Sequence, residues 1–301
     1  MSNRVVGLGQ ATVNYLGVAS RYVEPDNRRE LRTFSIQGGG TVATALAVLA
    51  NFGGTAATFV GKLSDDDFGR HIVRNLGAHG VDVAHVVVAP GFVSPFAFIT
   101  VEEAQRRPAV YYTRGNVPAL APGEVDLAVL DGAALLLIDG HHVKAQVAAA
   151  ERARACGVPV LLGAAGPAEG MGDLIALADT LLLTERFATE LSPRGELEDS
   201  LAELHAMGPR TVVILLGEAG AIGLEEGVVV RQPAFAADVV DETGAADVYA
   251  GAFAYALTRG WPLERRMRFA SVAAGLSCRA LGRRAALPDL NETLLACGWR
   301  E

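Results

Sequence analysis

Lysine is nearly absent from this chain of 301 residues, in which Lys62 and Lys144 are the only two. Arginine supplies the other cations, and 34 acidic residues outnumber the 26 basic ones, so the formal net charge is −8. A protein that binds DNA or RNA usually presents a basic face. The charge balance therefore argues against a nucleic-acid partner.

Cysteines and long apolar runs are also scarce. The three cysteines, Cys156, Cys278 and Cys297, have no paired spacing, so neither a zinc site nor a disulfide framework is indicated. No run of 18 or more apolar residues could span a membrane, and no basic-then-apolar signal opens the chain. We expect a cytoplasmic protein without a membrane partner. Hydrophobic residues make up 50% of the chain, enough for one large domain over residues 1–301.

From about residue 125 onward, short apolar runs alternate with helical patterns. Strands are expected at residues 134–138, 159–162, 180–183 and 211–215. Helices are expected at residues 142–156, 172–178 and 195–207, and, after a hairpin near 221–231, at about 244–259 and 262–281. Continuously apolar strands separated by helices are typical of a parallel sheet covered on both faces. The sequence thus predicts an α/β fold with a doubly wound, mostly parallel sheet.

Two segments in the first half of the chain do not follow this alternation of strands and helices. Strands are expected at residues 96–101 and 109–112, joined by a charged turn at 102–107, and a polar stretch covers residues 20–32. Our hypothesis is that segments of about 12–36 and 92–114 together form a small β-sheet that acts as a lid.

The clearest chemical signal lies where an expected β-rich run ends at Asp241 and a long apolar helix begins. Four small residues fill this turn: Thr243, Gly244, Ala245 and Ala246. Small side chains leave backbone N–H groups accessible, and the helix dipole favours an anion there. Asp247 follows directly, and a carboxylate beside an anion site could accept the proton of a hydroxyl that attacks a phosphate. The alternative is that Asp247 is only an acidic residue in the first turn of a helix.

Two glycine turns accompany this signal. Gly38, Gly39 and Gly40 precede an apolar helix at 41–52, and Gly217 and Gly220 follow the expected strand at 211–215. Ligands of α/β sheets bind beyond the carboxyl ends of strands, so the second turn could shape a nucleotide pocket. Either turn could instead be a simple tight turn that needs glycine.

Other candidate motifs fail. Gly7 and Gly9 follow a strand, but Thr12 replaces the glycine that a dinucleotide-binding fingerprint requires. The segment 54–62 lacks the spacing of a phosphate-binding loop. His141 and His142 have no suitably spaced partner for a metal, so we expect them to be solvated or to cap a helix.

The two glycine turns and the turn before Asp247, together with two further motifs, have the order and spacing of motifs in another group of proteins. In this respect the chain resembles the ribokinase-like (PfkB) carbohydrate kinases over essentially its whole length. The resemblance rests on residues 39–40, 61–69, 80–82, 216–220 and 241–247. Members of this family phosphorylate a hydroxyl of a sugar or nucleoside with ATP and Mg²⁺, using the aspartate of the last motif as base. The resemblance implies the same for this chain, allows for a monovalent cation, and implies a homodimer formed through the lid.

The resemblance also assigns residues. It implies catalysis by Asp247 with the backbone amides of Gly244, Ala245 and Ala246. The expected sugar-binding residues are Asn14, Gly39, Gly40, Thr44, Arg114 and Asp247. The expected nucleotide-binding residues are Thr184, Gly217, Gly220, Thr243, Gly244 and Ala246, and Glu185 could hold the metal through water. Arg114, at the end of a lid strand, could reach an anionic group on the sugar or be a solvated cation.

The chain departs from the family pattern at several of its motif positions. These residues are Asn14 in place of Asp, Thr41 and Thr44 in place of Asn, Thr184 and Phe187 in place of Asn and Glu, Gly163 in place of Asp, and Ala246 in place of Gly. A sugar kinase is the favoured prediction. A kinase of nucleosides or other small alcohols, and a catalytically impaired homologue that binds sugar or nucleotide, are the alternatives.

Overall fold

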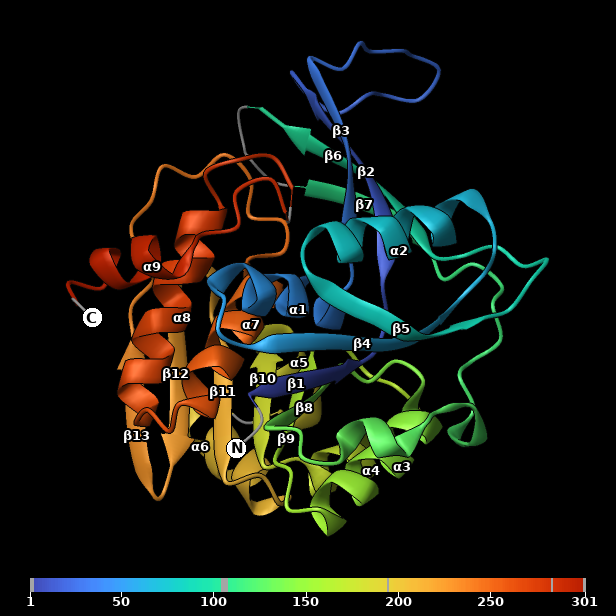
Figure 1. Cartoon of the computed structure of the whole chain (residues 1–301). Coiled ribbons are helices and arrows are strands. Elements are labelled where there is room, and N and C mark those ends of the chain that lie inside the picture. The colour runs from blue at the N-terminus through green and yellow to red at the C-terminus, as the bar shows by residue number, and fades with distance from the viewer. Residues whose placement is uncertain (1–2, 104–107, 194, 283, 300–301) are drawn as a thin grey trace.

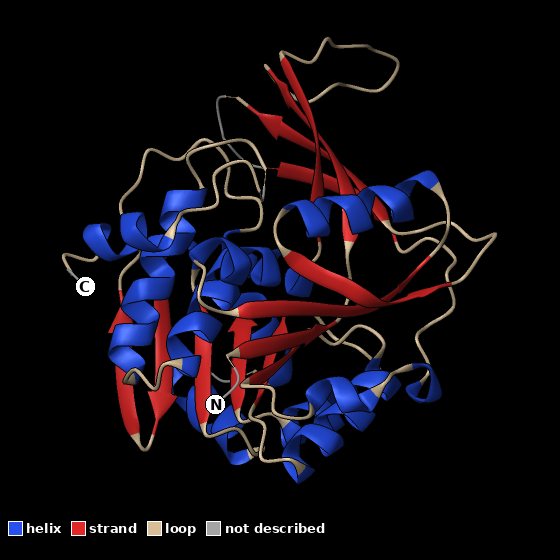
Figure 2. Cartoon of the chain, viewed as in Figure 1, coloured by secondary structure: helices blue, strands red, loops and turns tan. Residues whose placement is uncertain are grey.

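The computed structural model describes residues 3–103, 108–193, 195–282 and 284–299, which form a main β-sheet, a smaller sheet and the helices that cover them (Figures 1 and 2). In spatial order the described strands of the main sheet are β13 (Val228–Gln232), β12 (Ala221–Glu225), β11 (Thr211–Leu215), β10 (Thr180–Thr184), β9 (Val160–Ala164), β8 (Leu135–Ile138), β1 (Arg4–Leu8), β4 (Ala56–Leu63) and β5 (Val81–Val88). The strands from β11 to β5 pair in parallel, whereas β12 pairs antiparallel with both β11 and β13. The predicted mostly parallel α/β sheet is confirmed.

The strands read as continuous apolar runs because both faces of the sheet are buried. In β8, Leu135 and Leu137 belong to one hydrophobic core, while Leu136 and Ile138 belong to the other. The first core is closed by α1 (Thr41–Phe52), α7 (Ala245–Thr258) and α8 (Leu263–Ser277), with α9 (Leu290–Ala296) packed on α8. The second core is closed by α3 (Val143–Ala155), α4 (Met171–Leu177), α5 (Glu185–Leu191) and α6 (Leu197–Ala206).

The direction of winding reverses at β1. This strand pairs with β4 on one side and with β8 on the other, so the chain leaves the centre of the sheet in both directions. A crevice forms beyond the carboxyl ends of the strands at such a reversal, and ligands of α/β proteins bind there. The fold therefore marks the ends of β1 and β8 as the place to look for a site.

The smaller sheet has the described strand order β3 (Thr33–Gly39), β2 (Thr12–Ala19), β6 (Phe96–Glu102) and β7 (Pro108–Thr113). Helix α2 (Asp67–Ala78) packs against β2 and β3. The register aligns two rows of residues across this sheet. We call one the outward row; it consists of Ile36, Tyr15, Phe98 and Tyr111. We call the other the inward row; it consists of Gln37, Asn14, Ala97 and Tyr112. In the outward row Phe98 is 54% exposed and Tyr111 is 75% exposed, whereas in the inward row Asn14 is buried and Tyr112 is 69% exposed.

The structure differs from the sequence-based expectations in several elements. The expected β-rich run before Asp241 is wrong: the amides of Val240 and Asp241 both donate to the carbonyl of Cys278, so this segment pairs with the end of α8 instead of a strand. Helix α8 ends at Ser277 and not near residue 281. Strand β5 and the short helices α5 and α9 had no expected counterpart, and residues 104–107 of the charged turn lie outside the described residues. No described helix is long and apolar enough to cross a membrane.

Candidate active site

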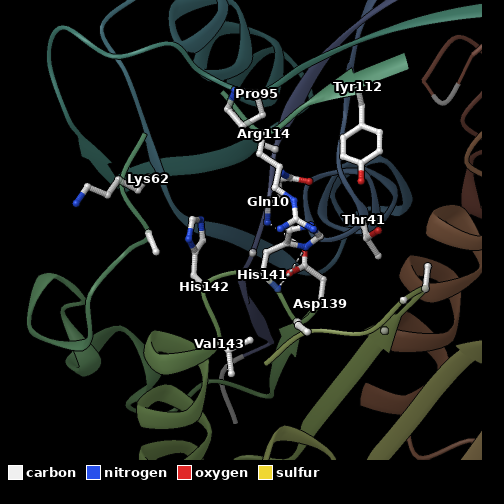
Figure 3. A pocket seen from close by; sticks show the side chains of 18 of the residues that line it. Gln10, Thr41, Lys62, Pro95, Tyr112, Arg114, Asp139, His141, His142 and Val143 are labelled. Carbon is white, nitrogen blue, oxygen red and sulfur yellow. Dashed lines mark hydrogen bonds and ion pairs between the residues drawn. The ribbon is translucent and has the colours of Figure 1, made fainter. Parts of the chain in front are cut away.

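A first cavity of about 500 Å³ lies beyond the carboxyl ends of β1, β4, β8 and β9, where the winding of the sheet reverses. Its wall includes Gln10 after β1, Asp139 and His141 after β8, and Tyr112 and Arg114 from the end of β7 (Figure 3). The inward face of the smaller sheet thus forms one side of this cavity, and the main sheet forms its floor.

Asp139 and His141 form a charged pair in this floor. The side chain of Asp139 is 1% exposed, and its Oδ1 lies 3.2 Å from His141 Nδ1. The carboxylate also accepts hydrogen bonds from the backbone amides of Gln10 (2.9 Å) and His141 (3.0 Å) and from Gln146 Nε2 (3.0 Å). A Cβ atom on Gly9 would lie only 2.4 Å from Asp139 Oδ2, so the carboxylate packs directly on backbone.

The pKa values of this pair move apart. Burial by itself would raise the pKa of Asp139, but the imidazolium of His141 and the hydrogen bonds outweigh it, and the pKa is lowered. Burial opposes the charge of His141, yet the adjacent carboxylate raises its pKa above the ordinary value. Burial lowers the pKa of the neighbouring His142, whose Nδ1 accepts a hydrogen bond from the amide of Leu120 at 3.1 Å.

The sequence-based expectation was that the two histidines are solvated or cap a helix. His142 occupies the N-cap position of α3 without a capping hydrogen bond from its side chain, and both His141 and His142 line the first cavity. The sequence did offer a signal: Asp139 directly follows the buried strand β8, and polar residues at such strand ends meet at one edge of a parallel sheet.

Of the expected sugar-binding residues, Arg114 lines the first cavity, whereas Asn14, Gly39, Gly40, Thr44 and Asp247 do not. A Cβ atom on Gly39 would be 2.4 Å from Asn14 Nδ2, and one on Gly40 would be 2.2 Å from the carbonyl oxygen of Gln10, which lines the cavity. Gly40 also has a φ of 94° at the N-cap of α1, which favours glycine. Thr44, one turn later, is fully buried, and its Oγ1 has no hydrogen-bond partner among the described residues.

A second cavity of about 790 Å³ lies beyond the ends of β10 and β11, beside the start of α7. It contains four of the six residues expected to bind nucleotide: Thr184, Gly217, Gly220 and Ala246. Much of its remaining wall is apolar, including Leu215, Phe235, Val239 and Ala274, and is suited to a flat aromatic base. Arg186 is the described residue that lines both cavities.

The turn before α7 is held by Asp241. This buried carboxylate accepts hydrogen bonds from the amide (2.9 Å) and the hydroxyl (2.7 Å) of Thr243 and from the amide of Gly282 (2.8 Å). Gly244 then adopts a φ of 83° as the N-cap residue, and Ala246 is already helical, so its methyl group causes no backbone strain. The amide of Ala245 donates to the carbonyl of Glu242 at 3.2 Å, which leaves the amides of Gly244 and Ala246 better placed for a ligand.

Asp247 lies in the first turn of α7, is 6% exposed, and lines neither cavity within the described residues. Its neighbours connect the two cavities. Ala245 and Ala246 line the second cavity, while Ala250, one turn after Asp247, would lie 3.9 Å from a Cβ atom on Gly163, a residue of the first. Residues three apart share a helix face, so Asp247 belongs to the part of α7 that lies between the cavities.

No cluster of three metal-ligating side chains is present in the described part of the chain. Three separate acids, Glu185, Glu218 and Glu242, line the second cavity. Mg²⁺ in phosphate-binding sites keeps several waters and uses only one or two carboxylates together with the phosphates. The donors in the second cavity fit a magnesium ion held in this way.

Known proteins resemble this chain over nearly its whole length. A model of the pfkB family carbohydrate kinases matches residues 2–290. A 5-dehydro-2-deoxygluconokinase of Geobacillus thermodenitrificans is 27% identical, covering 87% of this chain and 85% of the relative, and a ribokinase of Haemophilus influenzae is 23% identical over 98% of both chains.

The fold has a match among solved structures. Ribokinase of Arabidopsis thaliana, solved with ribose and ATP, matches with a TM-score of 0.84 and 24% identity, covering 100% of both chains. These comparisons confirm the fold class and the family predicted from the sequence. The chain belongs to the pfkB family of carbohydrate kinases, enzymes that phosphorylate a hydroxyl group of a sugar.

Proposed function

We propose that this enzyme transfers the γ-phosphoryl group of ATP to a hydroxyl of a sugar bound in the first cavity, with Asp247 as general base. The observation that carries the proposal is the position of Asp247 in α7, between residues that line the second cavity and a residue that packs on the wall of the first. A general base must lie within hydrogen-bond reach of the attacking hydroxyl where this hydroxyl meets the γ-phosphorus, so a position next to both cavities suits this role.

The second cavity suits the nucleotide. Its apolar wall can pack against the base, and the amides of Gly244 and Ala246 at the start of α7 can donate to phosphate oxygens. The positive end of the helix dipole adds to these donors. Charge that develops on the transferring phosphoryl group is stabilised there without reorganisation of the protein.

The first cavity suits the sugar. Thr41 and Gly163 line it and lie beside α7, so a hydroxyl bound at this end approaches Asp247. Catalytic contacts are often long before substrate binds and tighten in the complex. We therefore expect Asn14, Gly39, Gly40 and Thr44, which do not line the cavity in this structure, to contact the sugar once the smaller sheet closes over it.

Magnesium supplies positive charge to the phosphates when it is bound, and Glu185 is the residue that we expect to hold it through water. The protein's own residues orient the nucleotide, exclude water and accept the proton. The family resemblance also allows a monovalent cation to bind. Because the reaction consumes ATP, we propose that the enzyme acts in the cytoplasm.

We further propose that the smaller sheet is a lid and that two copies of the chain associate through its outward row. Phe98 and Tyr111 lie next to each other in this row and are both more than half exposed. Tyr15 contacts Phe98 with ring centroids 5.4 Å apart, which extends the apolar surface across β2 and β6. Exposed apolar surfaces of this kind mark interaction sites.

The proposed function is tested by ATP consumption in the presence of Mg²⁺ across a panel of sugars, sugar derivatives and nucleosides. We expect a sugar or sugar derivative to be the best acceptor. Turnover only with nucleosides would reassign the substrate class. Thermal stabilisation by ligands without any turnover would instead identify a catalytically impaired homologue.

A further inference from the structure

We propose that the sugar phosphorylated by this enzyme carries a negatively charged group, which Arg114 and His141 bind together in the first cavity. This inference rests on the proposed function and specifies its substrate class. The anion is a carboxylate or a phosphate-type group on the sugar, since the same cationic donors recognise both.

Arg114 is the cation of the first cavity that is available for a ligand. Lys62 donates to both carboxylate oxygens of Glu124, at 2.6 and 2.8 Å. Arg186 donates to the carbonyl of Ala165 at 2.8 Å and to Glu190 at 3.0 Å. Arg114, in contrast, has no hydrogen bond or ion pair with any residue that the structure describes.

The direction of these side chains agrees with this assignment. Arg114 extends from the end of β7 toward Gln10, His141 and Asp139, whereas the Lys62 ammonium points away from this group (Figure 3). The guanidinium therefore lies over the floor of the cavity, on the same side of β7 as Tyr112. A guanidinium presents two parallel N–H donors, which match the two oxygens of a carboxylate or phosphate.

The charges at this end of the cavity are unbalanced. The Asp139 carboxylate is paired with His141, and no carboxylate of a described residue forms an ion pair with Arg114, although Glu169 also lines the cavity. Arg114 also lies close enough to His141 to act against its protonation. An anion placed between Arg114 and His141 would compensate the charge of Arg114 and would also favour the protonated form of His141, which Arg114 by itself disfavours.

The anionic group and the reacting hydroxyl must lie at different parts of the sugar. Arg114 points toward His141, whereas Thr41, which lies to one side of them, and Gly163 are next to α7 (Figure 3). A sugar held by its anionic group at Arg114 would extend its hydroxyl toward Asp247. Arg114 would then set specificity and orientation without touching the nucleotide.

The test compares neutral and anionic acceptors. Fructose and glucose serve as the neutral sugars, gluconate as the carboxylate probe, and fructose 1-phosphate as the phosphate probe, each measured for kcat/KM with saturating ATP. We expect at least one anionic probe to exceed the neutral sugars, and the carboxylate and phosphate arms identify which anion fits. Equal or better use of neutral sugars would overturn the inference while leaving the proposed sugar kinase intact.

Variants of Arg114 decide the role of this residue. Arg114→Gln should raise KM for the preferred anionic sugar about 10- to 100-fold, the range for a hydrogen bond between charged groups, and leave KM for ATP unchanged. Arg114→Lys should keep part of the binding. Arg32→Gln is the matched control, because Arg32 pairs with Glu103 elsewhere on the smaller sheet.

Two results would contradict the assignment. An increase in KM for ATP in Arg114→Gln would place this residue on the nucleotide, and unchanged KM for every anionic probe would remove it from binding. If no sugar is phosphorylated, calorimetric binding of gluconate and fructose 1-phosphate to the wild-type protein and to Arg114→Gln still tests the inference. Loss of binding in the variant supports it, and equal or absent binding overturns it.

Discussion

His141 contacts Asp139 in the floor of the first cavity, with Nδ1 3.2 Å from Oδ1 and the carboxylate almost completely buried. The carboxylate raises the pKa of His141 above its ordinary value, so the folded protein holds this proton more tightly than the unfolded chain does. The resulting stability is fully present below about pH 6.5, the ordinary pKa of histidine, and is lost as the pH rises through the raised pKa.

The predicted consequence is a decrease in the free energy of unfolding across this pH range. Urea unfolding measured at intervals between pH 6 and pH 9 should show the decrease in the wild-type protein and a smaller one in His141→Gln. A pH profile that is the same in both proteins would show that this pair does not control the dependence.

Replacement of Asp247 by Asn tests the general base. The change preserves the shape of the side chain but removes its ability to accept a proton, and general-base catalysis contributes about 10²- to 10⁴-fold. We expect kcat to fall at least about 100-fold, while binding of a fluorescent ATP analogue is nearly unchanged.

Asp173→Asn is the control for this prediction. Asp173 is an acidic residue in the first turn of α4, so it shares the helix position of Asp247 without the place between the cavities. If both variants lost activity equally, or if Asp247→Asn remained fully active, Asp247 would be only an acidic residue near a helix start.

Gly40→Ala and Gly53→Ala separate two costs of adding a methyl group. Both glycines have positive φ, 94° and 73°, but the new Cβ atom would meet the carbonyl oxygen of Gln10 at 2.2 Å only in Gly40→Ala. A Cβ atom on Gly53 would meet no atom within 4 Å apart from those of its chain neighbours and its own helix. Overpacking costs about 1–3 kcal/mol beyond the shared backbone strain, so urea midpoints should show a larger loss of stability for Gly40→Ala. Equal losses would mean that the loop after β1 moves aside freely.

Phe98→Glu tests association through the outward row. A charge placed in a buried apolar interface is strongly unfavourable, so this variant should sediment as a monomer under conditions where the wild-type protein is a dimer. Val229→Glu, at an exposed site on β13, should leave the dimer intact. A dimeric Phe98→Glu protein would place the interface on another surface.

Much of the sheet could be predicted from sequence because its strands are buried on both faces. The apolar runs of β8, β9, β10 and β11 stand out between helices for this reason. The glycine turn at residues 217–220 and the small residues before α7 were informative because a backbone that approaches a ligand must lack bulky side chains.

The first cavity was harder to predict because its polar residues come from distant segments. Asp139 and Gln10 are 129 positions apart and meet only because β1 and β8 are neighbours in the sheet. Arg186 follows a strand that the sequence did indicate, yet its position beside both cavities depends on the short helix α5, which has too few residues to show a periodic pattern.

Tyr111 and Tyr112 are adjacent in β7, yet the first lies in the outward row and the second lines the first cavity. Successive side chains of a strand point to opposite faces, so a slip of one residue against β6 would exchange the two tyrosines. An insertion or deletion in this strand would therefore disturb both surfaces at once. Substitutions in β7 can change which sugar the enzyme accepts. The length of the strand, in contrast, is constrained by both the outward row and the first cavity.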